Sequence, residues 1–200
     1  MTIKALALLA AAVLPALAAG PVNGKVLGNP GAPIRLEIFS DFSCPGCKIL
    51  HENLLPILIR DFVNPGKAFI VFRDYVLPPV RGHEFSPVAA RYAVAANRVG
   101  KYQQVADALF LNQASWALSG KVWEVVAPVL TAAEQKKVQA LVKDPAIADE
   151  VTRDTDAGKR AGLVKTPTVG VNFRNQHQMW NEWTDNALFL GYLRELLKKQ

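Results

Sequence analysis

The two cysteines of this 200-residue chain, Cys44 and Cys47, are separated by only two residues. A disulfide between them would close so short a loop that it would stabilise the fold by only about 2 kcal/mol. The pair therefore cannot tie distant segments together, and the fold must depend on a hydrophobic core. Half of the residues are hydrophobic, which is sufficient for such a core. Two cysteines this close indicate a reactive pair.

An apolar segment at the N-terminus has the features of a secretory signal peptide. Lys4 supplies a positive charge, residues 5–17 are almost wholly apolar, and Ala16-Leu17-Ala18 offers small residues for cleavage. The apolar run is shorter than the ~20 residues that span a bilayer, and no later stretch is suited to crossing one. We expect residues 1–18 to be removed and the mature protein to be extracytoplasmic, in the periplasm or secreted.

The charge pattern argues against a nucleic-acid partner. The formal net charge is +6, but Lys and Arg are scattered along the chain. The densest pairs are Lys136-Lys137, Lys159-Arg160 and Lys198-Lys199, and all three fall on predicted helices. This distribution is typical of solvated helix surfaces.

The cysteines stand between a predicted strand and a predicted helix. Apolar and polar residues alternate over residues 33–40, which predicts a strand. Pro45 occupies a favoured first helical position, so we expect Cys44 to be the N-cap. The helix continues over residues 48–62 with a kink at Pro56. A short apolar run at residues 68–72 then predicts a buried strand.

Helices dominate the middle of the chain, and strands return near its end. Thr131 to Glu134 forms a capping box, and Asp144-Pro145 opens another helix. We expect helices over residues 86–100, 102–109, 122–130, 131–143 and 144–162, strands over 168–173 and 178–183, and a last helix opening at Thr184. The chain is therefore α/β, with a β-α-β unit and a β-β-α unit joined by an all-helical insertion.

Three features of this sequence resemble the DsbA-like group of extracytoplasmic oxidoreductases in the thioredoxin superfamily. They are the segment Phe39 to Cys47 (FSDFSCPGC), the helical insertion at residues 83–144, and Lys165-Thr166-Pro167-Thr168. The resemblance implies a thioredoxin fold built from residues 19–82 and 145–200. It also implies a thiol–disulfide oxidoreductase that acts on cysteines of exported proteins.

The position of each cysteine suggests its role. Disulfide exchange needs one thiolate and a second thiol that resolves the mixed disulfide. Cys44, at the helix N-terminus, should be exposed and should have a pKa of roughly 3.5–7.5. Cys47, one turn further along, should be more buried and should act as the resolving thiol. The disulfide itself would be the redox group, with no bound cofactor or metal.

The dipeptide Pro45-Gly46 sets the redox poise in this superfamily, as the resemblance implies. It offers no side-chain donor to the Cys44 thiolate, although Lys48 could add positive potential. We therefore expect a disulfide-forming oxidase that is less extreme than the strongest of the group. A reductase or an isomerase is the alternative.

The resemblance assigns a second loop to the site. Thr166-Pro167 matches the cis-proline loop that faces the cysteines in this superfamily, so we expect a cis peptide bond there. The Thr166 backbone could then pair with a substrate segment like an added strand.

One residue departs from the pattern of the group. The group commonly carries a buried acid six positions before the first cysteine, where this chain has Ile38. Glu37 is adjacent, but neighbouring residues of a strand face opposite sides. Glu37 is therefore a candidate for this role only if the strand carries a bulge.

A metal-handling or thiol-based binding protein on the same fold is the alternative from another class. Cys44, Cys47 and His51 have spacings that permit a Cys₂His site on one helix face. We favour an exposed His51 without a metal. The expected partners are unfolded, cysteine-containing exported proteins and a membrane redox partner. We expect a monomer, because only about fifteen mature residues precede Pro33.

Overall fold

The structure is a computed structural model that describes residues 24–78, 82–181 and 186–199. The predicted signal peptide and the predicted cap Thr184 lie outside the described residues. A five-stranded sheet has the order β1-β3-β2-β4-β5. Its strands are β1 (Val26–Leu27), β2 (Ile34–Ser40), β3 (Ala68–Asp74), β4 (Thr168–Phe173) and β5 (Gln176–Trp180). β2 is parallel to β3 and antiparallel to β4, so the β-α-β and β-β-α units meet at the central strand.

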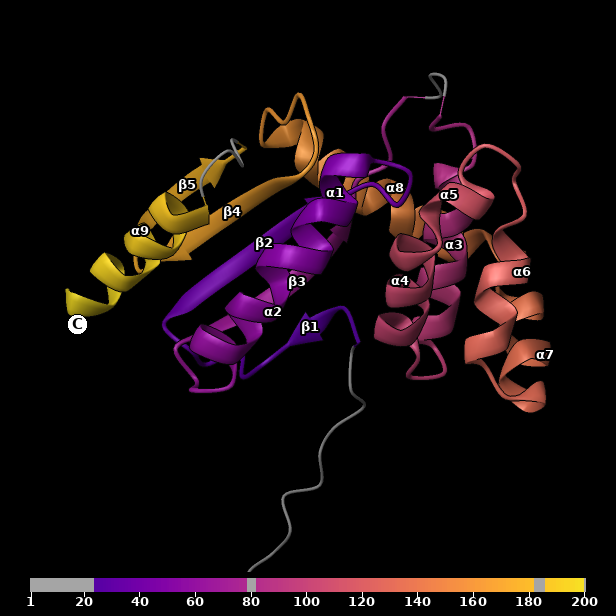
Figure 1. Ribbon diagram of the computed structural model, residues 1–200, viewed down its shortest axis with the longest axis horizontal. Helices are drawn as coiled ribbons and strands as arrows, with labels where there is room; N and C mark the ends of the chain where they lie inside the picture. The colour runs from indigo at the N-terminus through magenta and orange to yellow at the C-terminus, as the bar shows by residue number, and fades with distance from the viewer. Residues whose placement is uncertain (1–23, 79–81, 182–185, 200) are drawn as a thin grey trace, which may run out of the picture.

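The helix that follows the cysteines covers one face of this sheet (Figure 1). It runs without a break through α1 (Pro45–Ile49), η1 (Leu50–Leu54), α2 (Leu55–Leu58) and η2 (Ile59–Val63). The turns η1 and η2 are π-helical, and the Leu55 amide donates to the Leu50 carbonyl. Because Pro56 has no amide hydrogen, such wide turns let the chain pass it without ending the helix.

The insertion forms a group of helices beside the β1 and β3 side of the sheet (Figure 1). Its elements are α3 (Ser86–Asn97), α4 (Tyr102–Leu111), α5 (Gln113–Trp116), α6 (Val122–Val126), η3 (Ala127–Val129) and α7 (Ala132–Leu141). The helix α8 (Pro145–Arg160) packs against both α3 and β3. The predicted capping box at Thr131 and the predicted Asp144 cap are confirmed.

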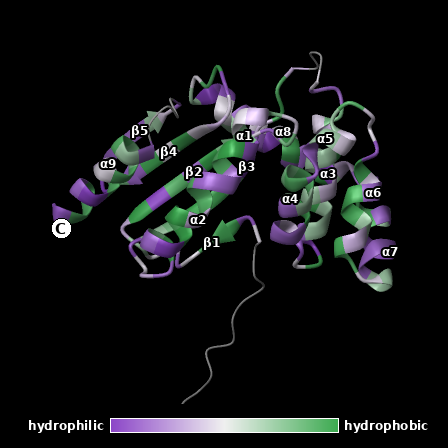
Figure 2. Ribbon diagram, in the orientation of Figure 1, coloured by the Kyte–Doolittle hydropathy of each residue, from purple (hydrophilic) through white to green (hydrophobic). Residues whose placement is uncertain are grey.

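The hydrophobic core is centred on the middle strand. Ile34, Leu36 and Ile38 of β2 are at most 1% exposed, and Figure 2 shows hydrophobic residues concentrated in β2, β3 and the facing helix. The last helix, α9 (Asn186–Lys198), buries Phe189 and Leu193. No helix in the described ranges is both long and apolar enough to cross a bilayer.

Candidate active site

The Cys44-Pro45-Gly46-Cys47 turn opens α1 in the predicted way. Cys44 is the N-cap with extended backbone angles (φ −75°, ψ 120°), and Pro45 begins the helix. The Cys44 carbonyl accepts hydrogen bonds from the amides of Cys47 (3.1 Å) and Lys48 (3.2 Å). These bonds hold the first turn of α1 against Cys44.

The loop before β4 covers this turn from the other side. The Thr166–Pro167 peptide bond is cis, as predicted. The Cys44 thiol lies 3.6 Å from the Thr166 carbonyl oxygen, to which it donates. A Cβ atom added to Gly46 would lie 3.1 Å from Pro167 Cδ, so the dipeptide and the cis-proline loop are in direct contact.

Both thiols are more enclosed than the sequence suggested. Cys47 is fully buried, and the Asp41 amide donates to its sulfur at 3.4 Å. Cys44 is only 8% exposed, so the prediction of an exposed Cys44 is wrong. The Thr166–Pro167 loop, distant in sequence, lies against this turn and excludes solvent.

The two thiols differ strongly in acidity. A hydrogen bond from the Cys47 thiol lowers the pKa of Cys44 to about 6, and Thr166 and the amides of Cys47 and Gly46 act in the same direction against burial. Burial raises the pKa of Cys47 well above its usual value, and its interaction with Cys44 raises it further. Both directions agree with the sequence prediction. The helix N-terminus thus favours a thiolate at one sulfur only.

Asp41 shapes the loop that leads into the turn. Its buried carboxylate accepts from the Ser43 amide (2.7 Å), the Leu77 amide (2.9 Å) and the Ser86 hydroxyl (2.6 Å). His83 also faces it, with Nδ1 at 3.3 Å. Asp41 therefore fixes the shape of this loop, and its partners from beyond β3 carry no local signal in the sequence.

Gln113, at the start of α5 in the insertion, is a site residue that the sequence analysis missed. Its side-chain amide donates to the backbone carbonyls of Phe42 (2.8 Å) and Cys44 (3.1 Å). The residue is 8% exposed. It lies 69 positions beyond Cys44, and no spacing pattern connects two segments so far apart.

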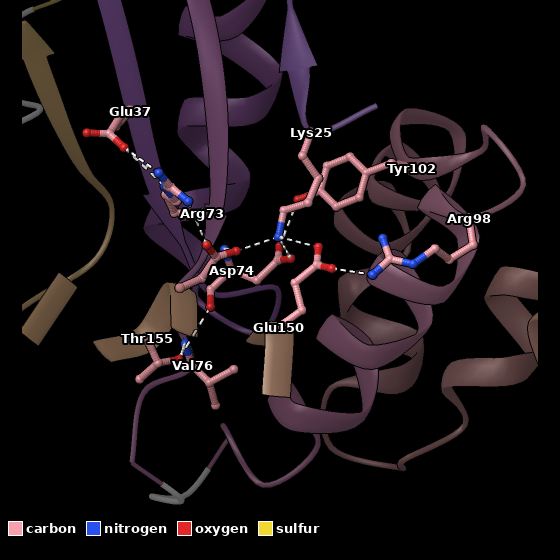
Figure 3. A network of polar contacts seen from close by, with 10 residues as sticks. Lys25, Glu37, Arg73, Asp74, Val76, Arg98, Tyr102, Glu150 and Thr155 are labelled. Carbon is pink, nitrogen blue, oxygen red and sulfur yellow. Dashed lines mark hydrogen bonds and ion pairs between the residues drawn. The ribbon is translucent and has the colours of Figure 1, made fainter. Parts of the chain in front are cut away.

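Glu37 points into an ion-pair network with Arg73 (Figure 3). Its carboxylate lies 2.7 Å from Arg35 Nη2 and 2.9 Å from Arg73 Nη2. Arg73 in turn pairs with Asp154. Ile38 occupies the buried face at 1% exposure. The register of β2 against β3 is regular throughout, so there is no bulge to turn Glu37 inward, and the candidate role of Glu37 as the buried acid is not supported.

Lys48 and His51, two further candidate residues, both contact α4 of the insertion. Lys48 Nζ contacts the Leu111 carbonyl (3.4 Å) and Glu52 (3.6 Å). His51 bonds Asp107 at 2.8 Å and its ring packs on Phe110. The predicted exposed position of His51 is wrong, because α4 covers the ring. The described residues contain no group of three or more His, Cys, Asp or Glu placed to hold a metal ion.

Comparisons with known proteins agree with this geometry. The sequence model described as Thioredoxin matches residues 21–186. Disulfide bond formation protein D of Bacillus subtilis (strain 168) is 24% identical over 151 residues, covering 74% of this chain and 67% of that protein. The crystal structure of Wolbachia pipientis alpha-DsbA1 matches with a TM-score of 0.71 at 19% identity, covering 88% of this chain and 91% of that one. Pseudomonas aeruginosa DsbA2 matches with a TM-score of 0.70 at 22% identity, covering 90% and 97%.

The family model, the curated relatives and the two cysteines at a helix N-terminus together define a DsbA-like thiol–disulfide oxidoreductase. This chain belongs to the thioredoxin family.

Proposed function

We propose that this protein is a disulfide-forming oxidase whose redox group is the Cys44–Cys47 pair, without a bound cofactor. The position of Cys44 at the N-cap of α1, where its pKa is lowered to about 6, carries the proposal. A thiolate stabilised by its surroundings favours the reduced form of the enzyme. The oxidised form is then the less stable partner, and it transfers its disulfide readily to other proteins.

The reaction consists of two exchanges. A substrate thiolate attacks the Cys44 sulfur of the enzyme disulfide, and the Cys47 sulfur leaves and takes up a proton. A second substrate thiolate then attacks the substrate sulfur of the mixed disulfide and releases Cys44 as a thiolate. Two electrons pass to the enzyme, and the substrate gains one disulfide. In the reverse direction, Cys47 is the thiol that resolves the mixed disulfide.

The surroundings of the turn suit an extended, unfolded substrate. Val164, in the loop before Thr166, is 85% exposed and Ile49 of α1 is 57% exposed. These side chains offer apolar contacts beside Cys44, while the Thr166 backbone is available for strand-like pairing. Phe42, just before the turn, is buried at 3% and supports the turn from inside.

Oxidation of exported proteins requires an extracytoplasmic location and a way to restore the disulfide. The signal peptide predicted at residues 1–18 supports such a location. The reduced pair would return its two electrons to a quinone-linked membrane partner. We propose that the protein works there as a monomer, with cysteine-containing exported proteins as substrates and no nucleic-acid partner.

A redox titration against glutathione tests the direction of electron flow. We expect an equilibrium potential well above the ~−270 mV of thioredoxin, and rapid oxidation of a reduced, unfolded protein by the oxidised enzyme. Cys47→Ala should accumulate a mixed disulfide when its Cys44 thiolate attacks a disulfide of an oxidised, unfolded protein and releases the other sulfur as a thiolate, whereas Cys44→Ala should form none. A potential at or below that of thioredoxin, with the pair mostly reduced in vivo, would identify a reductase or an isomerase instead.

A further inference from the structure

The active-site loop, residues 41–44, is held by side chains of the helical insertion. From α3, the Ser86 hydroxyl donates to Asp41 and lies 2.9 Å from the Ser43 hydroxyl. From α5, Gln113 donates to the carbonyls on either side of Ser43. The insertion therefore contacts both the side chains and the backbone of this loop.

Gln113 is suited to this contact by its chemistry. Its side-chain amide carries two donor hydrogens and no charge, and the two bonds go to the carbonyls of Phe42 (2.8 Å) and Cys44 (3.1 Å). Buried carbonyls that lose their donors are costly. A single neutral side chain thus satisfies two carbonyls next to a thiolate without adding a charge beside it.

The position of Gln113 is itself fixed. Trp116, in the same turn of α5, is fully buried and donates from its ring to the Leu109 carbonyl at 2.8 Å. The Ala117 amide donates to the Gln113 carbonyl. The amide of Gln113 consequently reaches the active-site loop from a rigid support in the insertion.

We propose that Gln113 is a positioning residue that sets the acidity of the Cys44 thiol. It does so by fixing the Cys44 carbonyl, which accepts the first hydrogen bonds of α1. The Cys44 carbonyl also accepts from the amides of Cys47 and Lys48, so its orientation determines how the first turn meets the sulfur. If Gln113 no longer holds this carbonyl, the turn relaxes and its amides align less well with the thiolate. The inference rests on the proposed role of Cys44 as the reacting thiol, but it holds for either direction of electron flow.

The test replaces Gln113 by residues of similar length. Gln113→Met removes both donors without a charge, and Gln113→Glu puts a carboxylate against two carbonyls beside Cys44. We expect the Cys44 pKa to rise in the order Gln, Met, Glu, by about one unit for Met. A rise of one unit from about 6 leaves roughly fivefold less thiolate at pH 6. Thiolate absorbance near 240 nm during a pH titration measures this shift in the reduced protein.

Gln135 provides a matched control. It is also in the insertion, and its side-chain amide also donates to two carbonyls, those of Ala127 (2.9 Å) and Leu130 (3.1 Å). Gln135→Met should leave the Cys44 pKa unchanged, although it lowers the thermal midpoint. The redox potential of each variant should follow its Cys44 pKa.

Two results would overturn the inference. One is a folded Gln113→Met protein whose Cys44 titrates as in the native chain. The other is an equal shift in Gln135→Met, which would show general loosening of the insertion. If Gln113→Glu does not fold, the comparison of Gln113→Met with Gln135→Met alone decides. A reducing potential with an intact Gln113 effect would refute the oxidase while leaving this inference standing.

Discussion

The pKa of Cys44 is lowered and the pKa of Cys47 is raised, although the two residues are only three positions apart. The Cys47 thiol, Thr166 and the first-turn amides all lower the pKa of Cys44, and together they outweigh its burial. Cys47 is enclosed on all sides, so burial determines its pKa. Because the Cys47 thiol is also a donor to Cys44, each residue helps to hold the other in its protonation state.

This difference predicts how the stability of the reduced protein depends on pH. The pKa of Cys44 is about 6 when folded and about 8.5 when unfolded. Its depressed pKa means that the thiolate stabilises the fold fully above pH 8.5 and that this stabilisation is lost as the pH falls through 6. The raised pKa of Cys47 opposes stability only above its unfolded value. Between pH 6 and 8, the reduced protein should therefore gain about 2 kcal/mol relative to the oxidised protein.

Urea unfolding of both redox forms measures this gain, since all other titrating groups are common to the two forms. Cys44→Ser, which has no thiol at this position and cannot form the disulfide, should lack the gain in stability that the reduced native protein shows between pH 6 and 8. A difference that stays constant between pH 6 and 8 would show that Cys44 is not a stabilised thiolate.

At the scale of elements, local sequence patterns predicted most of the helices and strands. Alternating apolar residues identified β2, the capping box identified α7, and Asp144 identified the start of α8. These signals work because each depends on neighbours within a few residues. β1 was missed because a two-residue strand has no pattern of its own.

Contacts between segments that are distant in the sequence could not be predicted in this way. The burial of Cys44 depends on the Thr166–Pro167 loop, and Gln113 reaches the active-site loop from 69 positions beyond Cys44. Periodicity and spacing carry no information on such contacts. The chemistry of Cys44 could be predicted from its helix position, whereas its enclosure could not.

The cap of α7 gives a prediction for a single element. The Thr131 hydroxyl accepts from the Glu134 amide at 3.4 Å, and the Glu134 side chain accepts from the Thr131 amide at 2.8 Å. Thr131→Ala should lower the free energy of unfolding by about 1 kcal/mol, as measured by urea denaturation. Disulfide exchange by the folded variant should be unchanged, because α7 lies outside the described contacts of the cysteines. Thr131→Ser, which keeps the hydroxyl acceptor, should lose much less free energy of unfolding.

At the scale of the whole molecule, a buried ion network joins residues beside β1, in β3, in α4 and in α8 (Figure 3). Lys25, beside β1, is 5% exposed and pairs with Asp74 of β3 at 2.7 Å and with Asp154 of α8. The Tyr102 hydroxyl of α4 donates to Asp74 at 2.7 Å. The network therefore links the edge strand, the sheet and the insertion through charges that have little access to water.

Removing the buried cation should be far more damaging than removing a cap. Lys25→Met leaves the carboxylates of Asp74 and Asp154 buried together without Lys25, and such losses cost about 3–5 kcal/mol. Burial already raises the pKa of Asp74. The folded variant should therefore bind protons more readily than the unfolded chain. Its loss in free energy of unfolding, relative to the native protein, should become smaller as the pH falls from 7 to 5.

Urea denaturation at both pH values provides the measurement. Lys159→Met removes a cation whose side chain is 65% exposed on α8, and it should change stability little at either pH. A Lys25→Met deficit that is small, or equal at both pH values, would show that the network contributes little.

The order of the active-site residues along the chain also determines when the site can form during synthesis. A chain that emerges N-terminus first presents both cysteines long before Ser86, Gln113 and Thr166 follow. Until these residues arrive, Cys44 has neither its enclosing loop nor the side chains that hold its turn. Its thiol should then titrate as an ordinary cysteine. Nascent copies would thus be poor exchange catalysts toward one another, and reactivity would appear only when most of the chain has emerged.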